Sequence, residues 1–378
     1  MMFKVICAVF LFIVISVNKS AGQSQVREIH SLKFLGEYDI PHKMNFDGTV
    51  IGGLSAIDYD AKNDVYYIIS DDRSSFNPAR FYTVKIKLKN DKIDTVVFKK
   101  VTTLKQQNGK VYPSSAEDPV HTPDPEGIRY NPTTKKLIWT SEGERIVRTG
   151  KTILEDPTII EIDSNGHYRD SFELPANMHM HATENGPRQN GVFEGLTFSG
   201  DYKKLYVNVE EPIYEDGNRA GLGDSTGWIR IIKFDTKTKK PEAEYGYQID
   251  AVANPPLFPG SFKINGIPDI LWVGPEKLLV TERSFSTGYV KCVIKVYLAD
   301  LSKATNVIHK SSLKDGKTFI PAKKKLLLNM NSLHIYTDNI EGATFGPILK
   351  NGHRSLVFVS DDNFAVFQKT QLLLFEID

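Results

Sequence analysis

The stretch "FEGLTFSGDYKKLYVNVEEP", residues 193–212, decides how this chain folds. An apolar run is followed by the turn residues Ser-Gly-Asp, and a second apolar run ends in the carboxylates Glu210 and Glu211. Short runs of aromatic and β-branched residues separated by turn residues are typical of paired β-strands. Because the same arrangement recurs in the chain, repeats must be identified before a fold is chosen.

Five copies of this strand pair are present. The other four are "GLSAIDYDAKNDVYYIISDD" (53–72), "EGIRYNPTTKKLIWTSEGE" (126–144), "GIPDILWVGPEKLLVTER" (266–283) and "EGATFGPILKNGHRSLVFVSDDN" (341–363). The aligned starts of successive copies, at Gly53, Glu126, Glu194, Pro268 and Glu341, lie 68 to 74 residues apart. A third apolar run follows each copy, at 81–88, 158–163, 228–235, 292–300 and 371–378. A weaker fourth run follows the first four copies, at 95–104, 166–174, 242–249 and 323–328.

These repeats predict an all-β fold, a β-propeller with five visible four-stranded blades. A sixth blade in more divergent sequence is the alternative. No fourth run follows the fifth copy, so we expect the segment 31–40, "SLKFLGEYDI", to complete that sheet and close the ring, which removes two open sheet edges. The insertions at 106–124, 175–192, 214–227, 255–265 and 302–319 are polar or rich in Gly and Pro, as surface loops are.

The N-terminus has the pattern of a secretory signal peptide. One Lys precedes an apolar run, and the small residues Ser20, Ala21 and Gly22 follow it, so residues 1–22 are predicted to be removed and residues 23–378 to form one propeller domain. The apolar run is shorter than the roughly 18–20 residues of a spanning helix. We therefore expect a secreted or periplasmic protein without stable membrane insertion. Removal of the signal leaves Cys292 as the only cysteine, which excludes an internal disulfide.

Overall charge excludes one class of partner. Lys and Arg total 47 and Asp and Glu total 46, which is too balanced to produce a field that attracts nucleic acid or an anionic membrane. Any electrostatic function must be local.

Acidic residues occupy equivalent positions in the repeats. In a propeller blade the first strand lines the channel and the second runs back beside it, so the start of strand one and the end of strand two meet at the same mouth. The predicted metal ligands at these positions are Asp71, Asp72, Glu126, Glu142, Glu194, Glu211, Glu282, Glu341, Asp361 and Asp362, with Asp269 just inside the fourth copy. Predicted catalytic residues are Glu126, Glu194 and Glu210.

So many carboxylates at one opening repel one another unless cations intervene. Clustered oxygen ligands suit Ca²⁺, or Mg²⁺ that retains water. The arginines Arg73, Arg145 and Arg283 lie close to the strand ends, where they are expected to pair with the acids and to bind substrate phosphate. The alternative is purely structural, with each acid accepting hydrogen bonds from backbone amides of the neighbouring blade.

Three other motifs carry weaker signals. The sequence "GDSTG" (223–227) matches Gly-x-Ser-x-Gly, but a strand rather than a helix follows Ser225, which disfavours a nucleophile there. His179 and His181 lie in a polar insertion without a third ligand at matching spacing. His121 and Asp124 lie closer to the predicted mouth, where His121 is a candidate general acid.

Several of these motifs together resemble the phytase-like family of exported propellers, known for an esterase-like activity of phytase. They are "GLSAIDYD", "YYIISDDR", "DPEGIRY", "NGVFEGLTFSGDYKKLYVNVEEP", "LLVTER" and "NIEGATFGP" with "SLVFVSDDNF", and the resemblance runs from about Gly52 to the C-terminus. It implies a propeller, export, Ca²⁺ in an acidic channel and a phosphoesterase-type activity. Asn363, in the last motif, joins Arg73, Arg145 and Arg283 as a predicted substrate-binding residue. The first and fourth copies lack the Glu-Gly start, so the implied site is asymmetric.

The leading hypothesis is an exported, metal-dependent hydrolase of small phosphate esters. Bound Ca²⁺ would position the phosphate and lower the pKa of a bound water, and Glu194 or Glu210 would take the proton. One alternative is a non-catalytic propeller that binds a ligand or protein and uses Ca²⁺ for stability. Another is a hydrolase of lactones or carboxylic esters.

Overall fold

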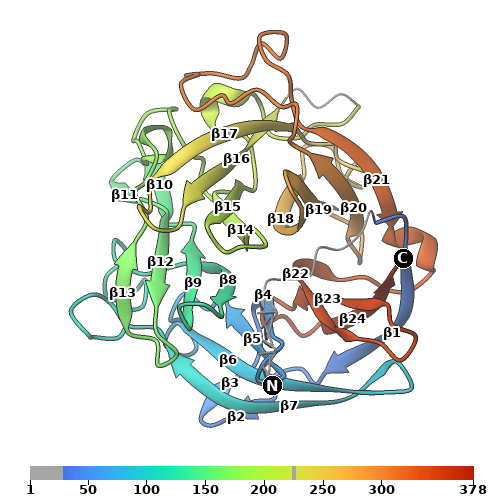
Figure 1. Cartoon of the computed structure of the whole chain (residues 1–378). Helices are drawn as coiled ribbons and strands as arrows, with labels where there is room; N and C mark the ends of the chain where they lie inside the picture. The colour runs from blue at the N-terminus through green and yellow to red at the C-terminus, as the bar shows by residue number, and fades with distance from the viewer. Residues whose placement is uncertain (1–28, 224–226) are drawn as a thin grey trace, which may run out of the picture.

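Five four-stranded antiparallel sheets surround a central channel in the computed structural model, which describes residues 29–223 and 227–378 (Figure 1). The all-β prediction and the count of five blades are confirmed, and the described residues form no sixth blade. The predicted signal peptide, residues 1–22, lies outside the described residues.

Each blade contains the strand pair and the two outer strands predicted from one repeat, apart from the fifth. Blade 1 consists of β4 (Leu54–Asp60), β5 (Val65–Ser70), β6 (Arg80–Lys89) and β7 (Lys92–Thr103), and blade 2 of β8 (Pro125–Asn131), β9 (Lys136–Ser141), β12 (Thr158–Ile162) and β13 (Tyr168–Ser171). Blade 3 consists of β14 (Phe193–Phe198), β15 (Lys204–Val209), β16 (Trp228–Asp235) and β17 (Pro241–Gln248). Blade 4 consists of β18 (Lys263–Gly274), β19 (Lys277–Ser286), β20 (Val293–Asp300) and β21 (Lys323–Asn329).

Blade 5 closes the ring with strands from both ends of the described chain. It contains β22 (Asn339–Ile348), β23 (Arg354–Asp361) and β24 (Thr370–Ile377), and β1 (Leu32–Ile40) pairs antiparallel with β24 from Leu32 opposite Ile377 to Ile40 opposite Thr370. Figure 1 shows β1, in blue, beside the red strands of this blade. The predicted ring closure by residues 31–40 is confirmed, because β24 would otherwise expose an unpaired edge.

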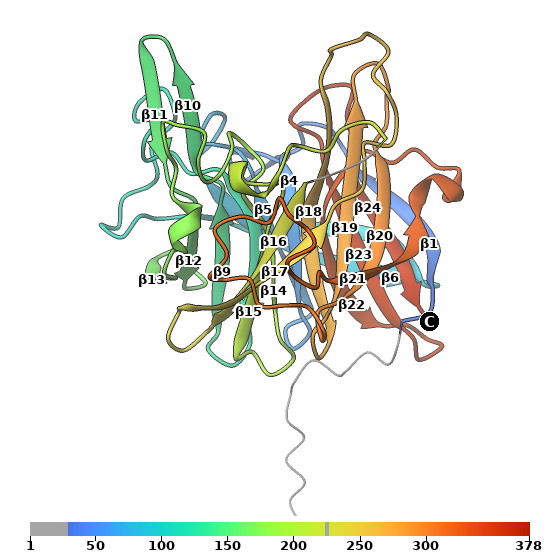
Figure 2. The ribbon, with the colours of Figure 1, turned by 90° about the horizontal axis from the view of Figure 1, so that it is seen from above.

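Two short hairpins and three 3₁₀ turns interrupt this pattern. The hairpins are β2 (Asn45–Phe46) with β3 (Thr49–Val50) and β10 (Glu144–Arg148) with β11 (Lys151–Glu155); the turns are η1 (Ala176–Met178), η2 (Tyr214–Asp216) and η3 (Met330–Leu333). The β10–β11 hairpin stands above one face of the ring, on the same side as the ends of the long strands β18 and β19 (Figure 2). This face carries the candidate site.

Apolar packing between neighbouring blades holds the fold. All six residues of β14 are buried, and the largest core cluster extends from β9 across blade 3 to β20. Cys292 is buried and free, so no disulfide contributes among the described residues. Burial of such apolar surface is the main stabilising term available to a chain of this size.

A buried ion pair joins four blades at the centre of the channel. Arg129, on β8, donates to both carboxylate oxygens of Asp269, on β18, at 2.9 and 2.8 Å. The same guanidinium also donates to the carbonyl oxygens of Ile57, in blade 1, and Ala343, in blade 5. Asp269 was expected at the mouth of the channel, but this pair places it inside the ring as a structural residue.

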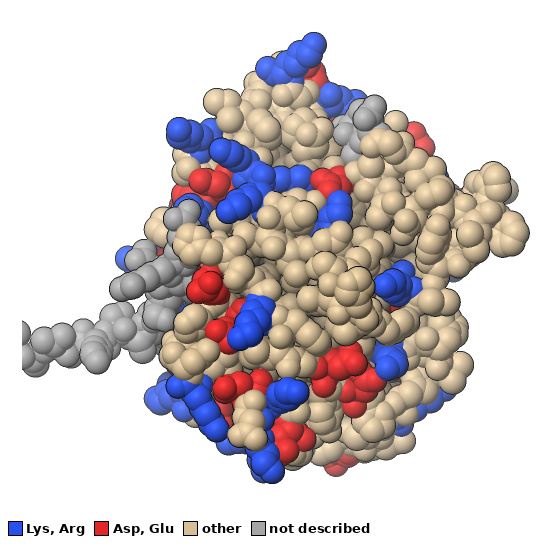
Figure 3. All heavy atoms as spheres, turned by 90° about the vertical axis from the view of Figure 1, so that its right-hand side faces the viewer, with Lys and Arg blue, Asp and Glu red and all other residues tan. Residues whose placement is uncertain are grey.

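One flank of the ring shows no field of one sign (Figure 3). Figure 3 shows Lys and Arg interspersed with Asp and Glu around large uncharged areas on one flank of the ring. In the residues that the structure describes, no helix has the length and apolar character needed to cross a membrane.

Candidate functional site

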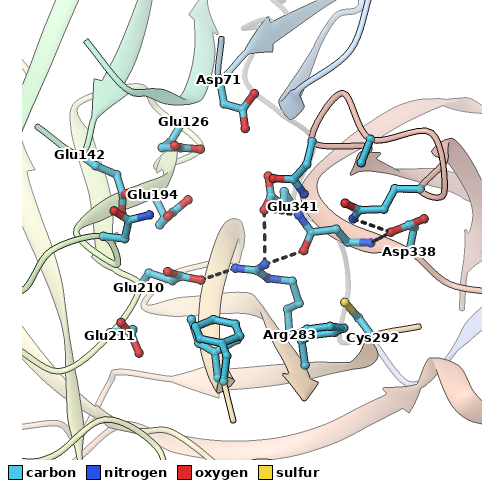
Figure 4. Close-up of a pocket in the computed structure, with 18 of the residues that line it drawn as sticks. Asp71, Glu126, Glu142, Glu194, Glu210, Glu211, Arg283, Cys292, Asp338 and Glu341 are labelled. Atoms are coloured by element: carbon cyan, nitrogen blue, oxygen red, sulfur yellow. Dashed lines mark hydrogen bonds and ion pairs between the residues drawn. The ribbon is translucent and has the colours of Figure 1, made fainter. Parts of the chain in front are cut away.

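A cavity of about 1110 Å³ opens at one mouth of the channel. Its walls contain nine acidic residues, which come from blades 1, 2, 3 and 5, and four basic residues. Figure 4 shows the labelled carboxylates in an arc around the cavity, with Arg283, from blade 4, opposite. The acids are Asp71, Asp124, Glu126, Glu142, Glu194, Glu210, Glu211, Asp338 and Glu341, and the bases are Arg73, Arg219, Arg283 and Lys291.

A β-bulge or similar irregularity interrupts the pairing of every first strand with its second strand and helps to direct these acids into the cavity. Pairing of the first and second strands shifts register between Pro125 and Ile128, between Phe193 and Leu196, and between Ile340 and Gly342, so Glu126, Glu194 and Glu341 each fall within a bulge. Blades 1 and 4 carry the same irregularity without an acid at the start. Bulges re-aim side chains, and here they turn three carboxylates toward the axis.

The glycine after each of these acids allows neighbouring first strands to approach closely. A Cβ on Gly195 would lie 2.5 Å from the Cα of Asp269 in blade 4, and one on Gly342 would lie 2.7 Å from the Cα of Ala56 in blade 1. Any larger residue would push the blades apart at the axis. The repeated Glu-Gly pair therefore combines a cavity carboxylate with close packing between blades.

Three groups of carboxylates are close enough to share a cation. Within each group, one ligand atom per residue lies within 4.8 Å of the others. The groups are Asp71, Glu341 and Asp361; Asp124, Glu126 and Glu142; and Glu142, Glu194 and Glu210. Glu142 belongs to two groups, so the second and third sites are adjacent.

Burial makes the charged forms of these acids unfavourable. Burial, with repulsion from neighbouring carboxylates as the next cause, raises the pKa of Asp71, Glu126, Glu194 and Glu341 well above the ordinary range. Glu194 also shares a hydrogen bond with Glu142, which favours a proton held between the two. A cation that replaced these protons would restore the charged forms.

Arginines offset part of the negative charge. Arg283 donates to Glu210 and to Asn339, both at 2.5 Å, and lies 3.5 Å from Glu341, while Arg73 lies 2.9 Å from Glu144. Burial alone would lower the pKa of the Arg283 guanidinium, but negative charge on Glu210 and Glu341 raises it. The predicted pairing of arginines with acids therefore occurs at two of the three named positions.

The donor set fits a hard divalent cation. Every ligand in the three groups is a carboxylate oxygen, which Ca²⁺ and Mg²⁺ prefer. Two further carboxylate oxygens near Arg73, Glu144 Oε1 and Glu155 Oε2, are buried and accept no hydrogen bond from the described residues. Buried acceptors normally have partners, so this excess of free oxygens favours cation binding.

Several predicted site residues lie elsewhere and have other partners. Asp72 accepts hydrogen bonds from the amides of Ser75, Phe76 and Asn77 and pairs with Arg80 at 2.7 Å. The loop after β5 thus satisfies Asp72 from within its own blade, whereas the structural alternative expected amides of the neighbouring blade. We leave Asp72 out of the proposed metal site.

Asp362, Glu282 and Arg145 are likewise held outside the cavity. Asp362 accepts from the amides of Gly53 and Phe364, and Glu282 accepts from Tyr247 and Asn265 and pairs with Lys324. Arg145 donates to carbonyl oxygens in the insertion 181–183. Apart from Asp72, Asp362 and Glu282, the structure brings the predicted metal ligands together with Arg73, Arg283 and Asn363. Arg145 also lies outside the cavity lining.

The histidines of the weaker motifs do not line the cavity. His121 is exposed and contacts Asp118. His179 lies in the insertion where it was expected and contacts Asp156, which lies outside that insertion. Asp124, next to His121 in the sequence motif, does line the cavity. Ser225 lies outside the described residues.

Sequence reasoning missed part of the cavity wall. Asn339 lies two residues before Glu341 and donates to both Glu341 and Asp361. Its position beside the start of the fifth repeat was the signal that could have identified it. Glu144, which ended the quoted second repeat without being chosen, lies outside the cavity lining but pairs with Arg73, which belongs to it. The apolar residues Phe262, Phe285, Tyr289 and Phe367 come from insertions and strand extensions that the repeats do not align.

The raised pKa values predict how stability depends on pH. Burial is the main cause of pKa values of about 6 for Asp124, about 7 for Glu142 and Asp361, and about 8 for Glu211. Because these pKa values exceed those of an unfolded chain, the stability they contribute is complete below about pH 4 and is lost as pH rises through 6 to 8.

Melting temperatures in chelator at pH 5, 6, 7 and 8 test this prediction. We expect the metal-free protein to melt at progressively lower temperature as pH rises over this range. With Ca²⁺ the trend should reverse, because deprotonated carboxylates bind the ion. Parallel curves with and without Ca²⁺ would contradict it.

One known family matches most of this chain. The sequence profile of the family described as "Phytase-like: Esterase-like activity of phytase" matches residues 49–364. No curated protein sequence matches significantly.

Among solved structures, similar chains include a β-1,3-galactosidase (10% identity, TM-score 0.44, covering 89% of this chain and 94% of that one). A periplasmic gluconolactonase of Pseudomonas aeruginosa is also similar (8% identity, TM-score 0.35, covering 85% and 84%). These likenesses concern the propeller architecture alone.

Proposed function

The chain belongs to the phytase-like family, whose residue pattern spans 49–364, and from that premise we propose that it is an exported, divalent-metal-dependent hydrolase of phosphate esters. One observation carries the proposal. Buried carboxylates from four of the five blades converge on one open cavity in three groups of cation-binding size. Such a concentration of like charge destabilises the metal-free fold, so function rather than stability accounts for it.

The three carboxylate groups would hold Ca²⁺, with Mg²⁺ as the alternative. When bound, the cation supplies a Lewis acid that draws electron density from phosphate oxygens and offsets their charge. Arg283, Arg73 and Arg219 lie on the same walls, and their guanidinium groups suit the remaining phosphate oxygens. Asn363 lines the cavity beside them and offers an amide for orientation.

Glu194 is the proposed proton acceptor. It is buried and shares a hydrogen bond with Glu142, so a proton can be held and moved at this pair. Glu210 is less suited, because its Oε1 is engaged by Arg283 and positions that guanidinium. Glu126, the third predicted catalytic residue, belongs with Asp124 and Glu142 and is assigned to cation binding.

The reaction then needs few groups. Glu194 accepts a proton from a water molecule as the water oxygen attacks phosphorus. The P–O bond to the alcohol breaks, the leaving alkoxide oxygen takes a proton from solvent water, and Glu194 returns its proton to solvent. The arginines hold the charge that develops on the phosphate oxygens. The cavity's largely buried walls strengthen each of these electrostatic interactions.

Export is part of the proposal. It rests on the charged, apolar and small-residue order of residues 1–22, and the family resemblance implies it too.

One experiment tests metal dependence and export together. We expect phosphate release from p-nitrophenyl phosphate in the exported fraction of expressing cells, a fall of at least about 10³-fold after chelation, and recovery with Ca²⁺. A boiled sample corrects for spontaneous hydrolysis, and the exported fraction of cells that do not express the chain corrects for contaminating phosphatases. Activity that is unchanged by chelator, or absent with every ester and ion, would refute the proposal.

A further inference from the structure

One part of the cavity lining is apolar, and we call it the apolar wall. It is formed by Phe262, Phe285, Tyr289, Val290 and Phe367, all of which line the same cavity as the acids. Val290 is 83% exposed, Phe367 81% and Phe262 56%, so their apolar surfaces are available to a ligand.

Exposed apolar side chains concentrate at this mouth. Of the fifteen large hydrophobic residues exposed in the described chain, seven come from the segments 257–262, 289–290 and 366–367. Single exposed hydrophobics are common, whereas several that line the same cavity as a group of acids mark a binding surface. The group is therefore part of the site rather than ordinary surface.

The wall is held in place by its own contacts. Thr287 donates through both its amide and its hydroxyl to the Phe262 carbonyl, and the amide of Leu257 donates to the Thr287 carbonyl. The Phe262 and Phe285 rings pack with centroids 6.4 Å apart. These bonds tie the two loops together, so the apolar surface is formed before a ligand arrives.

The segment that carries Phe367 is fixed in the same way. The Gln368 side chain donates to Asp338 at 3.0 Å, and Phe364 stacks on Phe76 with ring centroids 4.6 Å apart. Phe367 lies between these two anchors. Asp338 itself lines the cavity, so the apolar segment is anchored directly to its acidic part.

We propose that the site takes phosphate esters whose alcohol is apolar, with the phosphate at the carboxylates and the aryl or alkyl group against this wall. The inference rests on the proposed function and deepens it by naming the substrate class. A highly charged alcohol group would leave the apolar wall exposed to water, so the wall would contribute no binding free energy. Soluble aryl or alkyl phosphates and phospholipids in an aggregate share this chemistry.

Paired phosphonates test the inference without turnover. Methylphosphonate and phenylphosphonate carry the same head group, and their affinities for the Ca²⁺-loaded full chain are measured by calorimetry. We expect phenylphosphonate to bind at least about tenfold more tightly, since burial of roughly 60 Å² of apolar surface corresponds to such a factor.

Variants locate the preference on the wall. The double change Phe262→Ser, Phe367→Ser should reduce the ratio of the two affinities to near one and leave methylphosphonate binding unchanged. Ile348→Ser is the matched control, because Ile348 is 60% exposed at the other end of β22, whose first residue lines the cavity. Melting temperatures verify that all variants fold.

The outcomes separate this inference from the proposed function. If phenylphosphonate binds more tightly in a way that depends on Phe262 and Phe367, but no ester is hydrolysed, the inference about the apolar wall stands and the proposed enzymatic function is refuted. If esters are hydrolysed but both phosphonates bind with equal affinity, the inference about the apolar wall is refuted and the proposed function stands. The same holds if the preference for phenylphosphonate persists in the Phe262→Ser, Phe367→Ser variant. Failure of both phosphonates to bind would overturn both.

A second arm identifies the source of the substrate. Sedimentation with vesicles of phosphatidylcholine and phosphatidate, compared with binding of monomeric hexylphosphonate, distinguishes a lipid aggregate from a soluble ester. Vesicle binding lost in Phe258→Ser, Val290→Ser supports the lipid source, because both side chains are largely exposed in the segments that carry the wall. Binding of the monomer alone supports the soluble source, and binding of neither overturns the inference.

Discussion

Replacing Glu142 and Glu194 together by Gln should lower phosphate-ester hydrolysis by at least about 10³-fold while the metal-free protein becomes more stable. The two residues are in one cation-binding group with Glu210, and Glu194 is the proposed proton acceptor. Loss of a general base alone typically costs about 10²- to 10⁴-fold. Rate measurements at saturating Ca²⁺ test the first part.

The gain in stability follows from the same geometry. Both carboxylates are buried among other acids, and burial raises the pKa of Glu142 to about 7. A neutral amide removes this repulsion, and the amide oxygen introduced by Glu142→Gln can still accept from the amides of Gly191 and Val192, as the Glu142 carboxylate does at 2.6 Å. We expect the melting temperature in chelator at pH 8 to rise by a few degrees.

Glu282→Gln is the matched control for this variant. Glu282 occupies the same repeat position, within β19, but it pairs with Lys324 and Tyr247 outside the cavity. This change should lower stability and leave the hydrolysis rate at saturating Ca²⁺ close to that of the wild type. Equal loss of activity in both variants would mean that repeat position, and not the observed cavity, determines the site.

Arg129→Met should destabilise the fold by about 3–5 kcal/mol, because it leaves a buried carboxylate without its cation. The guanidinium contacts Asp269 and backbone carbonyls from blades 1, 4 and 5, and both side chains are almost fully buried. Met is close to Arg in length and cannot replace these hydrogen bonds. Chemical denaturation measures the loss.

The pH dependence of this loss identifies its cause. Burial raises the pKa of Asp269 to about 6 even with Arg129 lowering it, so without Arg129 the acid must be protonated to remain folded. The penalty should therefore be larger at pH 8 than at pH 5. The exposed pair of Lys85 and Asp64 is the control, and Lys85→Met should cost no more than about 1 kcal/mol. A similar small loss for Arg129→Met would contradict the central role of the pair.

The repeat determines most of the fold. Apolar runs such as residues 193–198 and 204–209 alternate with turns, and the copies recur at a nearly constant spacing. Five copies packed side by side bury apolar surface that a single copy would leave exposed. Closure by residues 31–40 followed from the missing fourth strand of the last repeat. The β10–β11 hairpin was not predicted, because it lies between the strand pair and the third apolar run of the second repeat and has no counterpart in the other repeats.

The site was predictable as a set and not residue by residue. Repeat position alone cannot tell Asp71, which lines the cavity, from Asp72, which faces the other way and accepts three loop amides. Alternate residues of an extended segment point in opposite directions, and the bulge decides which one faces the axis. The apolar wall could not be predicted, because only closure of the ring brings Phe262 and Phe367 to the same cavity.

Calcium titration of the chelator-treated protein at pH 8, followed by calorimetry, tests most directly whether the converging carboxylates bind divalent cations. The account predicts saturable binding of at least one Ca²⁺ per chain in the wild type, and much weaker binding after the Glu142→Gln, Glu194→Gln change. A titration with no heat of binding, together with a melting temperature that Ca²⁺ does not alter, would contradict it.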